Sequence, residues 1–338
     1  MNHNAFFAAL KAGALRACYL FEGTEEYIKQ QALRQLCQKW LPPGLEALNL
    51  AELSDPEPDA LIAAAETLPL MTSKRVVVVR DASALSASRK GDAQGDDALL
   101  DYLDRLPDTV CLVFYVKGKA DARRRLYGWF KKHDAIVDFS PMSDAECVQW
   151  VSASLRRAGK TIDRVTAARL VFTVGRDAAL LKQEMDKLCA YVQERPSITP
   201  EDIDAVCVRS TECSVFEMVD AQTDGRLNRA FAYLTDMLGG GESEFAILSM
   251  LLRQYRLLYH ARRLTDEGVP ASEMARLLGV APFAAGRAQK QARRFDLRRL
   301  QNAYDYLLEW EYRLKQGQIP HEACVHNAML RLEEILRA

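Results

Sequence analysis

The chain has 338 residues, of which 49% are hydrophobic and 27% are charged, and its formal net charge is −1. This composition is typical of a soluble globular protein with two or three domains, and it excludes a disordered chain. A net charge near zero also excludes a global field that would attract nucleic acid or a membrane, so any basic surface has to be local.

The sequence carries no sign of a membrane segment or of secretion. No apolar run approaches the roughly 18 residues of a membrane span, and the first residues lack a basic region followed by a long apolar core. The eight cysteines include no CxxC pair, and most lie in apolar patterns, so we expect reduced, buried thiols. We therefore expect a cytoplasmic protein without a membrane partner.

The first 141 residues alternate strand and helix signals. Short apolar runs predict strands at residues 18–21, 48–53, 76–79, 110–116 and 135–139, and helical patterns lie at 25–40, 58–67, 97–106 and 123–133. The polar, glycine-containing residues 86–97 predict a surface loop. Strands that alternate with helices predict a parallel sheet covered on both faces.

After residue 141 the strand signals stop. Ser143 and Glu146 have the spacing of a capping box, and short helical segments follow to about residue 208. Longer helical patterns fill residues 215–336. The sequence thus predicts an α/β domain at 1–141, a small helical domain at 142–210 and an all-α domain at 211–338.

An α/β domain followed by a small helical domain suggests a nucleotide-binding motor, which would need a phosphate-binding loop after the first strand. Such a loop requires several glycines, a lysine for the phosphates and a Ser or Thr for Mg²⁺. Residues 22–28 instead contain one glycine, no lysine and three acids. The segment Gly159-Lys160-Thr161 lacks the earlier glycine and follows a helical pattern, so Gly159 is better interpreted as a helix cap.

Other catalytic or metal-binding patterns are also missing. His321 and His326 resemble the zinc motif HExxH, but they are five residues apart rather than four and would face different sides of a helix. No GxSxG motif is present, and the other histidines have no evident nucleophile partner. The sequence therefore predicts no catalytic site, no metal and no cofactor.

Three large apolar residues, Leu68, Leu70 and Met71, lie on the connector between a helix and the strand at 76–79. Pro69 ends the preceding helix and favours an extended conformation at Leu68. Connectors usually carry polar residues because their backbone meets water. Two interpretations follow: the side chains turn inward and hold the helix to the sheet, or they stay exposed and bind another protein.

Residues 117–132 form a local basic segment with seven Lys or Arg residues and one acid. The apolar residues of its predicted helix face a core, which leaves Arg123, Arg124, Lys131 and Lys132 largely in solvent. They could contact the phosphates of DNA, and a simply solvated helix face is the alternative.

Distinctive segments occur in order along the whole chain, at residues 19–28, 68–79, 175–188, 198–203, 215–221, 241–242, 252–256, 278–283 and 314–317. Taken together, they resemble one family, the delta subunit of the bacterial DNA polymerase III clamp loader. The resemblance implies an AAA+-like domain with a parallel sheet and no phosphate-binding loop, a helical lid and an all-α collar. Its implied function is to bind and open the beta sliding clamp for loading onto primed DNA during replication.

The resemblance also implies partners and site residues. Leu68, Leu70 and Met71 would enter a pocket on the beta clamp, although the family commonly has Phe where this chain has Met71. The collar would join the ATPase subunits (gamma or tau) and delta-prime in a hetero-oligomer that acts on primer-template DNA. The subunit would have no active site of its own, within a polymerase holoenzyme classed as a nucleotidyltransferase. A divergent AAA+-like ATPase and a free-standing DNA-binding adaptor are the alternatives.

Overall fold

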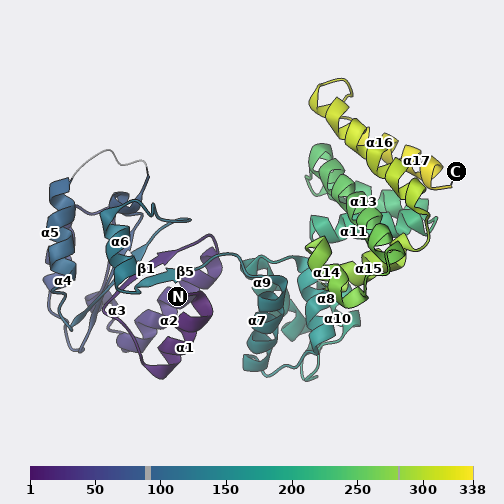
Figure 1. Ribbon diagram of the computed structural model, residues 1–338. Helices are drawn as coiled ribbons and strands as arrows, with labels where there is room; N and C mark the ends of the chain where they lie inside the picture. Colours follow the sequence, from purple (N-terminus) through teal and green to yellow (C-terminus); the bar gives the residue numbers. More distant parts are fainter. Residues whose placement is uncertain (88–92, 281, 338) are drawn as a thin grey trace. The chain divides into compact units, whose positions relative to one another are not determined.

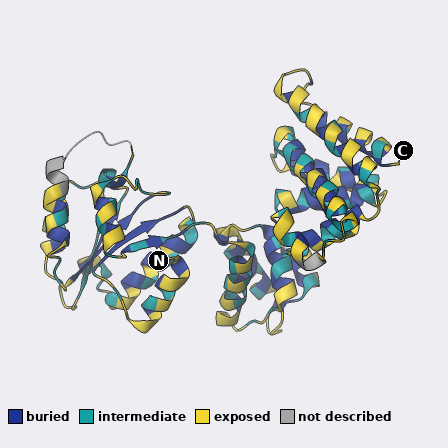
Figure 2. Ribbon diagram, in the orientation of Figure 1, coloured by how far each residue is buried: buried dark blue, intermediate teal, exposed yellow. Residues whose placement is uncertain are grey.

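The computed structural model describes residues 1–87, 93–280 and 282–337 (Figure 1). The chain separates into two compact units, Met1–Met142 and Ser143–Ala338, called here the amino-terminal and carboxy-terminal units. Each has its own buried core, which Figure 2 shows in dark blue. The division into three domains with a boundary at residue 210 stays a prediction.

The amino-terminal unit is built on a parallel five-stranded sheet with the order β2-β3-β4-β1-β5. Pairing is in register along each strand; Val77 of β3, for example, lies opposite Leu112 of β4. The strands are β1 Cys18–Glu22, β2 Leu50–Ser54, β3 Arg75–Arg80, β4 Val110–Tyr115 and β5 Ile136–Asp138. Strands β1 and β4 are fully buried, and so are the four valines of β3, as expected for a parallel sheet covered on both faces.

Helices cover both faces of this sheet (Figure 1). One face packs against α4, α5 and α6 in a cluster that includes Val77, Phe114 and Phe130. On the other face, Phe6 of α1 makes edge contacts with Tyr19 and Phe21 of β1. The helices are α1 His3–Ala12, α2 Glu26–Trp40, α3 Glu46–Asn49, α4 Pro58–Glu66, η1 Ser83–Leu85, α5 Ala93–Leu103 and α6 Arg125–Lys132.

The carboxy-terminal unit is entirely helical in the part of the chain that is described. Helix α7 begins at the predicted capping box, in which the Ser143 hydroxyl accepts from the Glu146 N–H and the Glu146 carboxylate accepts from the Ser143 N–H. Its helices are α7 Asp144–Arg157, α8 Arg164–Val174, α9 Ala178–Val192, α10 Pro200–Val206, α11 Thr211–Thr223, α12 Leu227–Gly239, α13 Glu244–Asp266, α14 Ala271–Leu278, α15 Pro282–Ala292, α16 Leu297–Lys315 and α17 Cys324–Arg337. A continuous apolar core joins α11–α13 with α15–α17.

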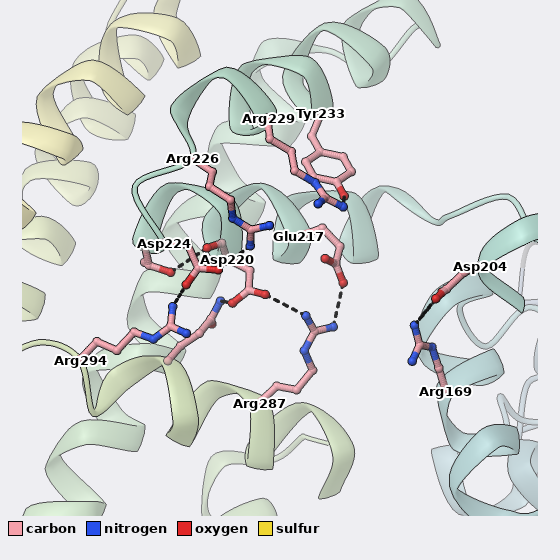
Figure 3. A network of polar contacts seen from close by, with 12 residues as sticks. Arg169, Asp204, Glu217, Asp220, Asp224, Arg226, Arg229, Tyr233, Arg287 and Arg294 are labelled. Atoms are coloured by element: carbon pink, nitrogen blue, oxygen red, sulfur yellow. Dashed lines mark hydrogen bonds and ion pairs between the residues drawn. The ribbon is translucent and has the colours of Figure 1, made fainter. Parts of the chain in front are cut away.

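A polar network joins α11 and α15 within this unit (Figure 3). The Arg287 guanidinium of α15 donates to Glu217 at 2.8 Å and to Asp220 at 3.1 Å, both on α11. The Phe172 ring of α8 meets the Phe216 ring of α11 edge to face, with centroids 5.2 Å apart. Charge pairing therefore joins α15 to α11, and aromatic packing holds α8 against α11.

Several elements differ from the sequence prediction. Helix α5 begins at Ala93, inside the predicted loop 86–97, of which residues 88–92 lie outside the described residues. Helix α6 begins at Arg125 and not at Arg123. The predicted strand 48–53 starts only at Leu50, because residues 46–49 form the short helix α3. Helix α1 was not predicted, although the Asn2 side chain caps it by accepting from the Ala5 N–H at 2.9 Å.

Candidate functional site

The connector between α4 and β3, residues 67–74, exposes its large apolar side chains. Leu68 is 77% exposed, Leu70 54% and Met71 81%. The interpretation in which they turn inward to hold the helix to the sheet is therefore wrong. Pro69 prevents α4 from continuing, and the chain then turns at Met71, whose φ is 59°. A positive φ at a residue other than glycine is unfavourable, and such conformations concentrate at functional sites.

The backbone of this connector is held in place although its side chains are exposed. The buried Asn49 amide accepts from the Leu70 N–H at 2.7 Å and donates to the Leu70 carbonyl at 2.9 Å. The Thr72 hydroxyl donates to the Lys74 carbonyl at 2.6 Å. Sequence reasoning missed Asn49, because it was assigned to a strand and a lone Asn before an apolar run carries no distinctive signal.

The loop after β1 uses its backbone N–H groups internally. The Gly23 N–H donates to the Gly118 carbonyl at 2.6 Å, and the Glu25 N–H donates to the Phe139 carbonyl at 2.9 Å. Gly23 has φ 119°, and a Cβ there would lie 2.3 Å from the Phe139 carbonyl group, so only glycine fits. A phosphate cradle needs free N–H groups that point at the ligand, and here these two are already bonded to protein carbonyls.

A buried lysine completes this closed loop. Lys29 of α2 is fully buried, and its ammonium group donates to the carbonyls of Gly23 and Val116, each at 2.8 Å. It also pairs with Glu26 at 3.0 Å and lies 4.7 Å from the centroid of the Tyr115 ring. Its charge is thus compensated from within the protein. Lys29 lies one residue beyond the segment 22–28, and its role in this loop was not predicted from the sequence.

The basic segment does not form one uniform surface. Arg123 is exposed, but its guanidinium makes two hydrogen bonds of 2.9 Å to Asp121 and lowers the pKa of that carboxyl to about 2. Arg124 was predicted to lie largely in solvent, and this is wrong. It is half-buried because its guanidinium donates twice, at 3.0 and 2.8 Å, to the Ser86 carbonyl.

Lys131 and Lys132 lie at the end of α6 with exposed side chains. Among the described residues, neither lysine forms an ion pair. Of the four predicted DNA contacts, these two are therefore the most available to a phosphate, Arg123 is shared with an acid, and Arg124 supports the loop at Ser86.

Neither a metal centre nor a membrane helix is found in the part of the chain that the structure describes. Over residues 1–87, 93–280 and 282–337, no three His, Cys, Asp or Glu side chains are grouped so that they could hold a metal ion. Among the same residues, no helix combines the length and apolar character needed to cross a membrane.

The parallel sheet with this strand order, covered by helices on both faces and followed by a helical unit, has the AAA+-like fold that the sequence predicted. A family model described as "DNA polymerase III, delta subunit" matches residues 19–140, and one described as "DNA polymerase III delta subunit, C-terminal domain" matches residues 212–332. Together they span more than half of the chain. The protein belongs to the DNA polymerase III delta subunit family.

A sequence and a solved structure, both from Bacillus subtilis, support this assignment. The chain is 26% identical to the DNA polymerase III subunit delta of strain 168 over 329 residues, which is 96% of this chain and 95% of that protein. The solved structure of the Bacillus subtilis DNA clamp loader delta protein shares its fold, with a TM-score of 0.58 and 24% identity, over 98% of this chain and 99% of that one.

Proposed function

We propose that this protein binds and opens a ring-shaped beta sliding clamp, so that a clamp loader can place the ring on primed DNA. The observation that carries this proposal is the connector at residues 67–74. Its three large apolar side chains are exposed to solvent, and Asn49 holds its backbone in place through hydrogen bonds to Leu70. Such side chains are what a partner's apolar pocket would bury. Leu68, Leu70 and Met71 are the clamp-binding residues in this proposal.

The partners follow from the family. The helical collar joins ATPase subunits of the gamma or tau type and delta-prime in a cytoplasmic complex, and Lys131 and Lys132 contact primer-template DNA. The exposed apolar residues Phe245, Leu308 and Tyr312 of α13 and α16 are suited to a subunit contact. Within such a holoenzyme this subunit supplies binding and mechanical work rather than a reaction step.

The alternative of a divergent ATPase is disfavoured by the loop after β1. Two of its N–H groups and Lys29 are engaged by protein carbonyls, so a triphosphate would have to break these bonds to enter. Titration of the purified chain with ATP separates the two functions, because submillimolar affinity would support the ATPase.

The direct test is binding of the purified chain to the beta clamp, measured by titration calorimetry. We expect one specific interaction that the replacement of Leu70 and Met71 by Ala weakens strongly. No binding at high micromolar concentrations would contradict the proposed function. Strong DNA affinity in the absence of any partner would favour the free-standing DNA-binding adaptor.

A further inference from the structure

The exposed large apolar side chains of the amino-terminal unit are concentrated in two segments. Among its described residues they are Met1, Leu48, Leu68, Leu70 and Met71. Apart from Met1, all belong to the connector or to α3. Leu48 is 46% exposed and immediately precedes Asn49, the residue that binds the connector.

Asn49, the last residue of α3, makes two side-chain hydrogen bonds to the connector and one to the start of its own helix. Its side-chain oxygen accepts from the Leu70 N–H at 2.7 Å, and its side-chain nitrogen donates to the carbonyls of Leu70 at 2.9 Å and Leu45 at 3.0 Å. Asn49 is fully buried, so these bonds are shielded from competing water. One side chain thus satisfies both backbone groups of Leu70, much as a neighbouring strand would.

Arg75 makes a second tie between the same segments. Its guanidinium donates to the Leu48 carbonyl of α3 at 3.0 Å and to the Ala64 carbonyl of α4 at 3.2 Å. Arg75 is also the first residue of β3. The end of α4, the short helix α3 and the start of β3 are therefore joined around the connector, and Leu48 belongs to the same held surface as Leu70.

We infer that the clamp-docking surface is composite: Leu48 adds a contact to the same apolar partner surface, and Asn49 is the positioning residue that sets the conformation of Leu70 and Met71. This inference rests on the proposed function. A connector already held in its binding conformation loses less conformational freedom when the clamp binds. The occupant is the ring-shaped clamp itself, because Leu48 is exposed and apolar like the proposed clamp contact and directly precedes Asn49, which binds Leu70.

The first test replaces Asn49 by Asp, which has nearly the same shape. The variant keeps an acceptor for the Leu70 N–H but places a carboxylate against the carbonyls of Leu70 and Leu45. We expect clamp affinity to fall roughly tenfold, because Leu70 and Met71 would then have to be ordered when the clamp binds, and the free-energy cost of ordering two side chains corresponds to about that loss. The control is Leu126→Ala in α6, a buried position outside the connector that lowers stability without touching the docking surface.

A merely structural role for Asn49 would be detected in two ways. Asn49→Asp would then lower the melting temperature yet leave clamp affinity unchanged at temperatures where the protein is folded, or it would weaken binding no more than Leu126→Ala does. A double-mutant cycle adds a stricter criterion. In the Leu70→Ala/Met71→Ala background, Asn49→Asp should cause no further loss of affinity, and a full additional tenfold loss would overturn the positioning role.

The second test is Leu48→Ala. We expect clamp affinity to fall about fivefold, because the half-exposed side chain has about half of its apolar area left to bury. The matched control is Leu180→Ala, an equally exposed leucine on α9 of the other unit, which should leave affinity unchanged. Unchanged affinity of the Leu48 variant would confine the docking surface to the connector.

Failure of this inference can be told apart from failure of the proposed function. If the native chain does not bind the clamp, the proposed function fails. If the chain binds but Leu70→Ala/Met71→Ala leaves the affinity intact, docking through the connector fails and the composite surface fails with it. If that double variant loses binding while the Asn49 and Leu48 variants bind normally, only the composite surface is wrong.

Discussion

The guanidinium of Arg287 lies 4.5 Å from the centroid of the Phe216 ring, while the same group donates to Glu217 and Asp220. One side chain of α15 is therefore paired with two acids of α11 (Figure 3), and it also lies over an aromatic ring of the same helix. Phe172 of α8 packs against the same Phe216 ring. Arg287 is thus the position at which the charged and aromatic contacts of this junction meet.

Replacement of Arg287 by Ala should loosen the junction of α8, α11 and α15. It removes two charge-assisted hydrogen bonds and a cation–π contact and leaves two neighbouring acids without their cation, at a cost of about 1–3 kcal/mol. Amide hydrogen exchange in these three helices should become faster, and Arg298→Ala, at an exposed position of α16, should change nothing. Unaltered exchange in the Arg287 variant would show that apolar packing alone holds the junction.

Replacement of Leu70 and Met71 by Ala should separate clamp binding from stability. Burial of each side chain in a clamp pocket is worth about 1.5–3 kcal/mol, so the double variant should bind at least about thirtyfold more weakly. Its melting temperature should barely change, because both side chains are exposed in the free protein. Calorimetric titration and thermal unfolding of the same samples decide the matter; a large loss of stability with intact affinity would refute clamp docking through these residues.

Replacement of Lys131 and Lys132 by Ala should reduce DNA affinity of the assembled loader on all sequences alike. The slope of log affinity against log salt should shrink by roughly 0.9 for each lysine that contacts a phosphate. Arg124→Ala should instead destabilise the loop at Ser86, since its guanidinium is bonded there, with little change in the salt slope. An unchanged slope in the lysine double variant would assign α6 to the solvated surface.

Lys29→Met should destabilise the amino-terminal unit. The carbonyls of Gly23 and Val116 would lose their donor and Glu26 its cation, at a cost of about 2–4 kcal/mol. Denaturant unfolding measures this, and Lys39→Met at an exposed position of the same helix should stay within about 0.5 kcal/mol of the native chain. If the Lys29 variant is equally stable, the loop after β1 is held by its backbone bonds alone.

Thiol labelling should begin at Cys189. Burial raises the pKa of Cys213 and of Cys324 to about 12, so their thiolates are scarce at neutral pH. Of the eight cysteines, seven are buried and Cys189 is half-buried. Mass spectrometry after brief maleimide treatment should find the modification at Cys189 first, and Cys189→Ser should leave the native chain nearly unreactive. Rapid labelling at Cys213 would indicate local opening near α11.

The sequence predicted those elements whose signals are local, such as a run of apolar residues or a helix cap. Four valines bounded by basic residues predicted β3, and the Ser143–Glu146 spacing predicted the start of α7, because hydrophobic periodicity and capping are local properties. The exposure of Leu68 and Met71 was left open, since a connector can turn either way and only its tertiary contacts decide.

Contacts between side chains and backbone groups that are far apart in the sequence could not be predicted. Arg124 belongs to a basic run, yet Ser86, 38 residues earlier, gives it a structural partner. Asn49 and Leu70 are 21 residues apart, and neither has a pattern that announces the other. Lys29 donates to the carbonyl of Val116, and three strands, β2 to β4, lie between these two residues in the sequence. Such pairs depend on strand order, which local patterns do not specify.

The closed loop after β1 bears on whether ATP could control when this subunit binds a partner. A ligand shifts a conformational equilibrium only if it binds the two states with different affinity. Because Lys29 and the N–H groups of Gly23 and Glu25 are already bonded to protein groups, we expect ATP to bind this unit poorly and to leave partner binding at residues 67–74 unchanged. Under the proposed function, control of docking and release would then fall to the other subunits of the complex.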